Sequence, residues 1–451
     1  MNIDTIVALA TPPGTGGVAV VRISGADAIA IGRRLHSAGA KAVRTPRSLV
    51  FGVVGDTSHT IDQGMMVVMP SPRSYTGEDV VELHLHGGAA IVSEVITRAI
   101  GLGARAAEPG EFTKRAYLNG KLDLIEAEAV GEAIAADTTA ALRQAELKAS
   151  GVVSGQIEQL RARLVAQIAK LSANLDFGEE DIADIDLTVL ERELADIASQ
   201  IQEWLAAADT AAIISDGLGV AIVGLPNAGK SSLLNVLVGF ERAIVTTQPG
   251  TTRDTLSEEV SIRGVKVRFV DTAGLRAARD EVEKLGIGRS LVSSRQAQVV
   301  LVAASADQNM AKLRLEIGRL SLSDDAIVVG VQTKIDTFKS TITWPFGTQA
   351  VIRTSAITGE GLSNLRETIY RLGIGSIRLD AAVITSARQL ATLRSGSELL
   401  SAAQAAISAG ATTDVIAGEL TVAAEQLGGL LGEAVSTEVI DAIFANFCIG
   451  K

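Results

Sequence analysis

The eight residues Gly224-Leu225-Pro226-Asn227-Ala228-Gly229-Lys230-Ser231 match the pattern G-x-x-x-x-G-K-[ST] and follow the short apolar run GVAIVG. The segment that continues from them, SSLLNVLVG, favours a helix. In a loop of this kind the backbone N–H groups point inward and hold phosphate oxygens at the N-terminus of the helix. Lys230 can reach the β- and γ-phosphates, and the Ser231 hydroxyl can ligate Mg²⁺. The stretch therefore predicts a P-loop between a strand and a helix.

The residues around this loop, 217–375, alternate between short apolar runs and helical segments. Four of the runs have the length and composition of buried strands: GVAIVG, KVRFVD, VVLVAAS and AIVVGVQ. Such an alternation of strands and helices is typical of a doubly wound parallel sheet. We therefore expect an α/β domain built around the P-loop.

Further segments follow in the order that a GTP-binding domain requires. Residues 250–254, GTTRD, offer threonine hydroxyls for Mg²⁺, and residues 271–274, DTAG, place a carboxylate for a metal-bound water at the end of a predicted strand. Residues 333–336, TKID, resemble the N-K-x-D guanine box, where Asp336 could accept two hydrogen bonds from guanine, each worth about 1.5–3 kcal/mol. Ser355-Ala356 fits the last box. Together with the P-loop, these segments predict GTP as the nucleotide.

Two positions depart from the usual pattern. Thr333 stands where asparagine is usual, and because a hydroxyl donates only one hydrogen bond, the affinity for guanine is left open. Leu275 stands where small GTPases often place the glutamine that orients the attacking water. A polar side chain between Arg276 and Gly286 would have to take over that role.

The segments outside the α/β domain differ in their proline content. The first 118 residues hold short β-branched runs between Gly/Pro turns, which predicts a small α+β domain. Residues 110–225 and 346–451 contain no proline, which favours helices because proline costs about 3 kcal/mol inside a helix.

We therefore predict a multidomain chain with an N-terminal α+β domain (1–118), a first helical segment (119–214), an α/β P-loop GTPase domain (215–376) and a second helical segment (377–451). The helical segments are expected to form one discontinuous all-α domain with the α/β domain inserted. Two separate helical domains are the alternative.

The composition narrows the class of protein. The 451 residues carry 41 Lys and Arg against 52 Asp and Glu, so the net charge is −11 and a generally basic nucleic-acid coat is excluded. A single cysteine, Cys448, rules out a disulfide framework and a cysteine-based zinc site. Neither a secretory signal nor an apolar window of about 18 residues is evident, so we expect a cytoplasmic protein without a membrane segment.

Several further blocks of sequence are specific to one family of proteins. They are ATPPGTGGVAVVRISG, YTGEDVVELHLHGG, PGEFTKRAYLNGKLDLIEAEAV and the terminal FCIGK. On these blocks, and on GLPNAGKSSLLN, GTTRD and DTAGLR followed by DEVEKLGI, the whole chain resembles the MnmE (TrmE) family of tRNA-modification GTPases.

The resemblance implies an architecture and an activity. Members of this family combine an N-terminal folate-binding and dimerisation domain with a two-segment helical domain and an inserted GTPase domain. With the flavoprotein MnmG they add an aminomethyl or carboxymethylaminomethyl group to carbon 5 of the wobble uridine of certain tRNAs. A tetrahydrofolate, the 5-formyl or the methylene derivative, supplies the one-carbon unit, and K⁺ stimulates GTP hydrolysis. The resemblance thus implies a homodimer that forms a heterotetramer with MnmG and acts on tRNA.

The resemblance also implies roles for individual residues. Glu283 would position the attacking water, which Leu275 cannot do. K⁺ would neutralise charge between the β- and γ-phosphates, as an arginine finger does in other GTPases. The implied metal ligands are Ser231 and Thr252 for Mg²⁺, and Asn227, Thr246, Gln248 and Thr251 for K⁺. The implied folate-binding residues are Arg22, Glu82, Lys121 and Lys451. The residues expected to contact GTP are Asn227, Ala228, Gly229, Lys230, Ser231, Ser232, Thr246, Thr247, Gln248, Pro249, Gly250, Thr251, Thr252, Asp271, Thr272, Ala273, Gly274, Thr333, Lys334, Asp336, Ser355 and Ala356.

Some interpretations stay open at this point. Glu82, His84 and His86 alternate and so share one face of a strand, where they could line a pocket or, less in keeping with the pattern, bind a metal. A lone cysteine such as Cys448 is usually a small buried residue, although its place in the tail also allows a role near the one-carbon chemistry. Lys114 and Arg115, with Arg105, could touch RNA.

Two other classes of protein share the GTPase boxes. A ribosome-assembly GTPase would need an RNA-binding module such as a KH domain, and the alanine-rich C-terminal segment does not resemble one. A regulatory GTP switch that serves no enzyme is the second alternative. Binding of a reduced folate would separate both from the expected function.

Overall fold

The computed structural model describes residues 4–55, 59–177, 186–207, 213–214, 216–239, 258–270, 297–320, 322, 326–375 and 383–451. These residues form two compact units. Unit 1 comprises residues 1–135, 145–198 and 392–451, and unit 2 comprises residues 136–144 and 199–391. The long segment of unit 2 therefore lies, along the chain, between two segments of unit 1.

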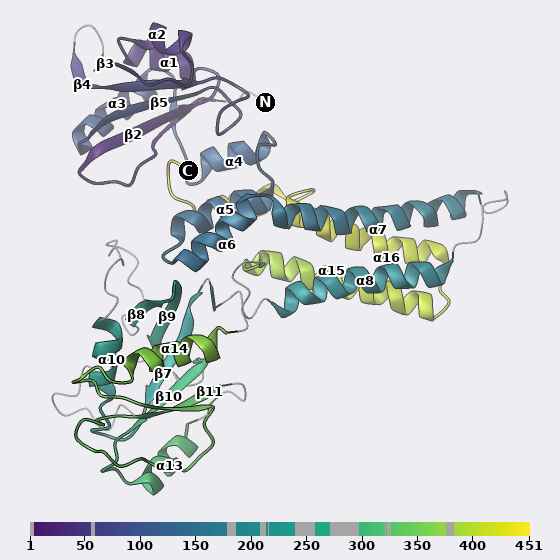
Figure 1. The fold of residues 1–451 in the computed structure, drawn as a ribbon. Helices are drawn as coiled ribbons and strands as arrows, with labels where there is room; N and C mark the ends of the chain where they lie inside the picture. Colours follow the sequence, from purple (N-terminus) through teal and green to yellow (C-terminus); the bar gives the residue numbers. More distant parts are fainter. Residues whose placement is uncertain are drawn as a thin grey trace. The chain divides into compact units, whose positions relative to one another are not determined.

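Unit 1 begins with a six-stranded sheet in the order β3-β4-β5-β2-β1-β6 (Figure 1). Neighbouring strands are antiparallel, except that β1 and β6 are parallel. The runs VAVVRIS, MMVVMP and VVELHLH lie in β2, β4 and β5, which confirms their prediction as strands. The strands are β1 (Ile6–Leu9), β2 (Gly16–Ser24), β3 (Val50–Gly55), β4 (Thr60–Met69), β5 (Val80–Gly87) and β6 (Arg105–Ala106).

The two faces of this sheet differ, because successive side chains of a strand point to opposite sides. Val21, Ile23 and Leu83 are fully buried in a core that also contains residues of α1 and α3. Arg22 and Glu82, at the alternate positions, belong to the other face. The helices are α1 (Ala28–Leu35), α2 (Gly39–Arg44), α3 (Ala89–Gly101) and α4 (Glu111–Leu118).

The rest of unit 1 is helical, as the proline-free segments predict. Helix α7 of the first helical segment packs along helix α16 of the second helical segment (Figure 1). Within the described residues, no helix combines the length and apolar content needed to cross a membrane. The helices in or partly in this unit are α5 (Leu124–Ala135), α6 (Thr139–Ala149), α7 (Val152–Phe177), α8 (Leu187–Ala206), α15 (Ala387–Ser408), α16 (Thr413–Leu431) and α17 (Thr437–Phe444).

Unit 2 contains a second six-stranded sheet, in the order β12-β11-β10-β7-β9-β8. All neighbours are parallel except the β8–β9 hairpin. The four predicted strands are confirmed as β7, β9, β10 and β11, whereas the edge strands β8 and β12 were not predicted. The strands are β7 (Leu218–Val223), β8 (Glu258–Ile262), β9 (Val265–Val270), β10 (Val299–Ala304), β11 (Ile327–Gln332) and β12 (Ala350–Arg353).

Helices cover both faces of this sheet, which confirms the doubly wound arrangement. The central strand β7 is buried throughout. Val220 and Ile222 share one core with residues of α10 and α14, whereas Ala221 and Val223 share another with Leu313 of α13. The helices are α10 (Lys230–Gly239), α13 (Met310–Gly318) and α14 (Leu362–Gly373). The carboxyl ends of the strands β7 and β11 lead into the P-loop and the TKID box.

Candidate functional site

The P-loop passes from the end of β7 to the first residue of α10 at Lys230. At its start, the backbone of Gly224 runs so close to β10 that a Cβ would lie 2.2 Å from the carbonyl oxygen of Ala303. Any larger residue would push the loop away from the sheet. Because the first N–H groups of a helix have no partner within it, the N-terminus of α10 offers hydrogen-bond donors for an anion.

Five consecutive carbonyl groups of the loop, from Gly224 to Ala228, accept hydrogen bonds from side chains. Lys230 Nζ donates to the carbonyl oxygens of Gly224 and Leu225, each at 2.9 Å. The next three acceptors are Pro226 from Gln308 Nε2 (2.9 Å), Asn227 from Lys334 Nζ (2.7 Å) and Ala228 from Thr333 Oγ1 (2.7 Å). The loop is therefore held from the side of its carbonyl groups.

Among the side chains that bind the carbonyl groups of the P-loop, Lys230 has a charged form that burial destabilises. Burial lowers the pKa of its amino group. Its two partners are neutral carbonyl groups of its own loop. A phosphate would supply the negative charge that these partners lack.

The TKID box connects the end of β11 to the P-loop. Thr333 is buried, and its N–H donates to the carbonyl of Ala304 at 2.8 Å. Its hydroxyl donates its one hydrogen to the carbonyl oxygen of Ala228. Thr333 thus links the TKID box to the P-loop through its side chain.

Asp336 lies beside the segment that follows β12. Its Oδ2 accepts a hydrogen bond from the Thr337 hydroxyl at 3.0 Å, whereas Oδ1 is inaccessible to solvent and has no hydrogen-bond partner within the described residues. The hydroxyls of Ser355 and Thr337 stabilise the carboxylate and lower the pKa of Asp336. Ser355 Oγ also accepts bonds from the N–H groups of Ile357 (3.2 Å) and Thr358 (3.1 Å), which fixes the turn.

Several predicted residues lie outside the described part of the chain. They are Thr246, Thr247, Gln248, Pro249, Gly250, Thr251, Thr252, Asp271, Thr272, Ala273, Gly274 and Glu283, together with Leu275. Ala228, Gly229, Lys230, Ser231 and Ser232 lie at the turn into α10. Sequence reasoning missed Gln308, whose contact with Pro226 joins residues 82 positions apart.

In unit 1 the structure brings two of the four predicted folate residues together. Arg22 and Glu82 are direct neighbours on β2 and β5, and Arg22 Nε donates to Glu82 Oε1 at 2.8 Å. The Arg22 guanidinium lies 5.4 Å from the ring centre of Tyr75 and 5.6 Å from that of Phe112. These two rings were not predicted, although Tyr75 and Phe112 belong to family-specific blocks.

The two histidines of β5 have different neighbours. His84 Nε2 lies 3.4 Å from Glu82 Oε2, whereas His86 Nδ1 and Asp62 Oδ1 are 2.7 Å apart. Among the described residues, no group of three or more His, Cys, Asp or Glu side chains could hold a metal ion. Glu82 therefore faces Arg22 with one carboxylate oxygen and His84 with the other.

The C-terminal tail lies against the start of α4. The N–H of Phe112 donates to the carbonyl of Lys451 at 3.1 Å, and the N–H of Gly110 donates to that of Cys448 at 3.3 Å. A Cβ on Gly450 would lie 2.0 Å from the carbonyl oxygen of Leu9, so only glycine allows this approach.

The remaining predicted residues of unit 1 lie near the surface. Cys448 is exposed, which corrects the expectation of a buried thiol. Lys121 Nζ donates to the carbonyl of Pro72 at 3.3 Å.

The basic residues of α4 are paired with carboxylates. Arg115 is only 8% exposed and donates to Asp4, Glu78 and Glu111. Lys114 is paired with Asp441. Carboxylates of the same unit therefore neutralise these cations, and their contact with RNA stays a prediction.

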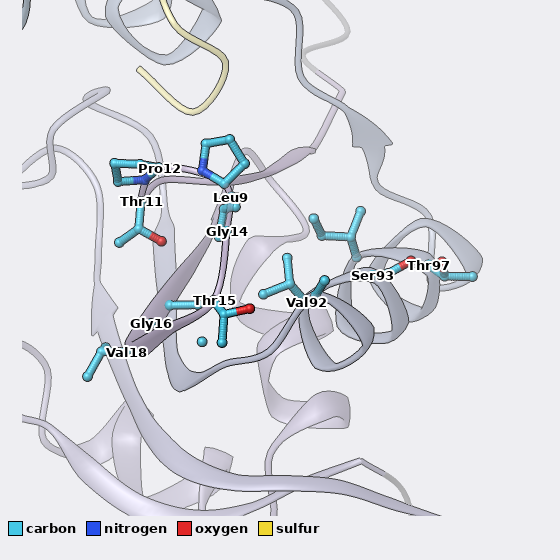
Figure 2. Close-up of a pocket in the computed structure, with 15 residues that line it drawn as sticks. Leu9, Thr11, Pro12, Gly14, Thr15, Gly16, Val18, Val92, Ser93 and Thr97 are labelled. Carbon is cyan, nitrogen blue, oxygen red and sulfur yellow. The ribbon is translucent and has the colours of Figure 1, made fainter. Parts of the chain in front are cut away.

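A cavity of about 540 Å³ lies between the loop after β1 and α3 (Figure 2). Leu9, Thr11 and Thr15 line it from the loop side, and Val92 and Ser93 line it from the helix. Its walls carry no charged side chain. The pair Arg22–Glu82 belongs to the opposite face of the sheet, so the cavity is not the site of that pair.

A P-loop at the end of a central strand, tied to a T-K-x-D box two strands away, defines a P-loop nucleotide-binding protein of the GTPase type. Two family descriptions match the chain: "MnmE helical domain" over residues 124–448 and "GTP-binding protein TrmE N-terminus" over residues 5–121. The chain therefore belongs to the MnmE family of tRNA-modification GTPases.

Relatives match along the whole length. A protein of Natranaerobius thermophilus named tRNA modification GTPase MnmE is 39% identical over 460 residues, which is 100% of both chains. One of Moorella thermoacetica with the same name is 39% identical over 470 residues, 99% of each chain. The G domain of the T. maritima FeoB iron transporter is 27% identical over 34% of this chain and 98% of its own, with a TM-score of 0.26, too low to support an argument about fold.

Proposed function

We propose that this chain binds and hydrolyses GTP and uses this cycle to modify the wobble uridine of tRNA together with the flavoprotein MnmG. The observation that carries the proposal is the P-loop whose carbonyl groups are held by Thr333 and Lys334 of the TKID box. This arrangement connects the phosphate site and the base site directly. Membership in the MnmE family supports tRNA as the substrate that is modified.

The described residues divide the binding of GTP between them. The P-loop and the N-terminus of α10 hold the phosphates, and Lys230 exchanges its two carbonyl partners for phosphate oxygens. The carboxylate of Asp336 is proposed to accept hydrogen bonds from the N–H edge of guanine. Thr333 positions the loop and leaves recognition of the base to Asp336 and the backbone at Ala356.

Two cations are proposed at the phosphates. Their donor set consists of oxygen atoms, the ligands that Mg²⁺ prefers: Ser231 and Thr252 for Mg²⁺, and Asn227, Thr246, Gln248 and Thr251 for K⁺. Both ions supply positive charge beside the β- and γ-phosphates. Glu283 is proposed to position the attacking water.

A reduced folate is proposed to bind in unit 1. Glu82 suits the donor edge of a pterin, and Lys121 and Lys451 suit the carboxylates of the glutamate tail. The tail contacts at Gly110 and Phe112 support this assignment, because they place the last residues beside the ring that lies under Arg22. The finer architecture that we propose is a homodimer, with an N-terminal folate domain and a GTPase domain inserted into a discontinuous helical domain.

The test is the state of the wobble uridine. Transfer RNA from cells lacking this chain is digested and analysed by mass spectrometry, with and without a plasmid that restores the chain. We expect the aminomethyl or carboxymethylaminomethyl nucleosides to disappear and to return with the plasmid, but not with a Lys230→Ala version. Unchanged nucleosides in the deleted cells would refute the proposal.

A further inference from the structure

We propose that the exposed surface of α1, α2 and the adjoining loops binds the phosphate backbone of tRNA. We call it the basic face, and its residues are Arg33, Arg34, Lys41, Arg44, Arg47 and Arg73. The inference rests on the proposed function, since it locates the surface that holds the tRNA partner of that function.

The charge of this segment is opposite to that of the chain. Between Ala28 and Gly55 there are five Lys or Arg residues and no Asp or Glu, whereas the whole chain has 52 acidic against 41 basic residues. A basic segment in an acidic protein is the electrostatic footprint expected of a polyanion site.

The fold gathers these cations on one surface. Arg33 and Arg34 lie in the last turn of α1, Lys41 and Arg44 lie in α2, and the two helices pack against each other. Beyond α2, Arg47 Nη2 donates to the carbonyl of Arg73 at 2.8 Å, which brings the loop before β5 to the same group.

The cations of the basic face are exposed and lack acidic partners. Within the described ranges none of the six forms an ion pair, although arginines elsewhere in unit 1, such as Arg22 and Arg163, are paired with carboxylates. On α3, which packs against α1, Glu94 is already paired with Arg98 at 3.0 Å. No carboxylate of the described residues therefore neutralises these six cations, and they stay available to an anion from outside.

The residue types favour nucleic acid over a lipid surface. Five of the six cations are arginines, whose planar guanidinium binds phosphate through two parallel hydrogen bonds. Membrane-surface helices combine basic residues with exposed apolar ones. No large apolar side chain of α1 or α2 is exposed, and in the loop after α2 only Leu49 is, at 54%.

The experiment measures binding of fluorescently labelled bulk tRNA to the full-length protein by anisotropy at several salt concentrations. Arg34→Gln/Arg44→Gln is compared with wild type and with Lys312→Gln/Arg314→Gln, which removes two exposed charges from α13. Each lost phosphate contact reduces the salt slope by about 1, so we expect the first variant to lose about 2 in slope and on the order of 10-fold or more in affinity near 0.1 M salt. The α13 variant is expected to bind like wild type.

Two measurements separate charge from fold and from the wider function. Arg34→Lys/Arg44→Lys should restore most of the affinity, and GTP turnover of all variants should equal that of wild type. Equal tRNA affinity and slope for Arg34→Gln/Arg44→Gln, or no tRNA binding by wild type, would overturn the inference. So would wild type that binds vesicles of phosphatidylserine but not tRNA. The proposed function is tested separately, by GTP turnover and by the wobble nucleosides of cells with and without the chain, so a failure of the basic face is distinguished from a failure of that function.

Discussion

At the scale of the residue, Thr333 shows how one atom can join two parts of a site. Its hydroxyl donates to the buried carbonyl of Ala228, so Thr333→Val would leave that acceptor without a partner. A buried unsatisfied group costs about 1–3 kcal/mol. We expect Thr333→Val to weaken binding of a fluorescent GDP analogue by roughly 5- to 150-fold, whereas Thr333→Ser retains it. Equal loss in both variants would mean that the methyl group, and not the hydrogen bond, matters.

Asp336 carries the choice of base in this proposal. The carboxylate of Asp336 can only accept hydrogen bonds from a base, whereas the amide of an Asp336→Asn side chain would present an N–H to a ligand whose edge carries an acceptor. The variant is expected to prefer xanthosine triphosphate over GTP. The preference is measured as the ratio of the kcat/KM values for these two nucleotides. A variant that keeps the preference for GTP would remove the TKID assignment.

Glu111 is the centre of an ion network that also contains Arg105, Arg115 and Asp4. Burial raises the pKa of Glu111, but the hydrogen bonds from Arg105 and Arg115 outweigh it and lower the pKa below its ordinary value of 4.5. The native state therefore binds fewer protons than the unfolded state at acidic pH. The stability from this carboxylate is present above pH 4.5 and is lost as the pH falls through the lowered value.

The corresponding prediction concerns Glu111→Ala, which leaves the largely buried Arg115 with fewer acidic partners. Breaking a buried pair typically costs about 3–5 kcal/mol, so unit 1 should unfold at lower urea in circular dichroism at pH 7. Below pH 4 the difference in the free energy of unfolding between variant and wild type should become smaller. If this difference did not depend on pH, lost packing, and not the lost ion pairs, would explain the lower stability.

At the scale of the element, the last five residues contact the N-terminal part of unit 1 at Gly110 and Phe112. Deleting Phe447 to Lys451 removes the contacts with Gly110 and Phe112 and the cation proposed for folate. We expect reduced-folate binding, measured by calorimetry, to weaken by at least about 10-fold, while basal GTP hydrolysis stays near wild type. Cys448→Ser tests the thiol alone. Full tRNA modification by the truncated chain would contradict the role of the tail.

The strands differ in how well their sequences predict them. β7, β10 and β11 are nearly continuous apolar runs because helices cover both of their faces, and such runs are recognisable. β8, EEVSI, has polar residues at the sheet edge, and β6 has only two residues, too few for any period. Pairing with a neighbour, and not local composition, defines these strands.

The candidate sites divide in the same way. The P-loop and the TKID box are local patterns, so the sequence is sufficient to predict them. The pair Arg22–Glu82 joins residues 60 positions apart, and the rings beneath Arg22 come from two further segments. Only the tertiary fold brings such residues together, so the sequence suggested them through family resemblance alone.

At the scale of the whole molecule, the residues proposed for the two ligands belong to different units. The P-loop and the guanine box belong to unit 2, whereas Arg22, Glu82 and the tail belong to unit 1. A ligand that binds only the native state stabilises it by about 2.7 kcal/mol at 100 times its Kd. For a unit of roughly 200 residues, this corresponds to a rise of about 5–10 °C in Tm.

Calorimetric unfolding of the full chain is therefore expected to show two transitions, each responding to its own ligand. GDP with Mg²⁺ should raise the Tm of one transition, and Lys230→Ala should abolish that shift because the amino group no longer meets the phosphates. A reduced folate should raise the Tm of the other transition, and Glu82→Ala should abolish this second shift alone. ATP, which lacks the N–H edge that Asp336 would bind, serves as the control. A single transition that GDP and folate both shift would show that the units unfold as one and would contradict their thermodynamic independence.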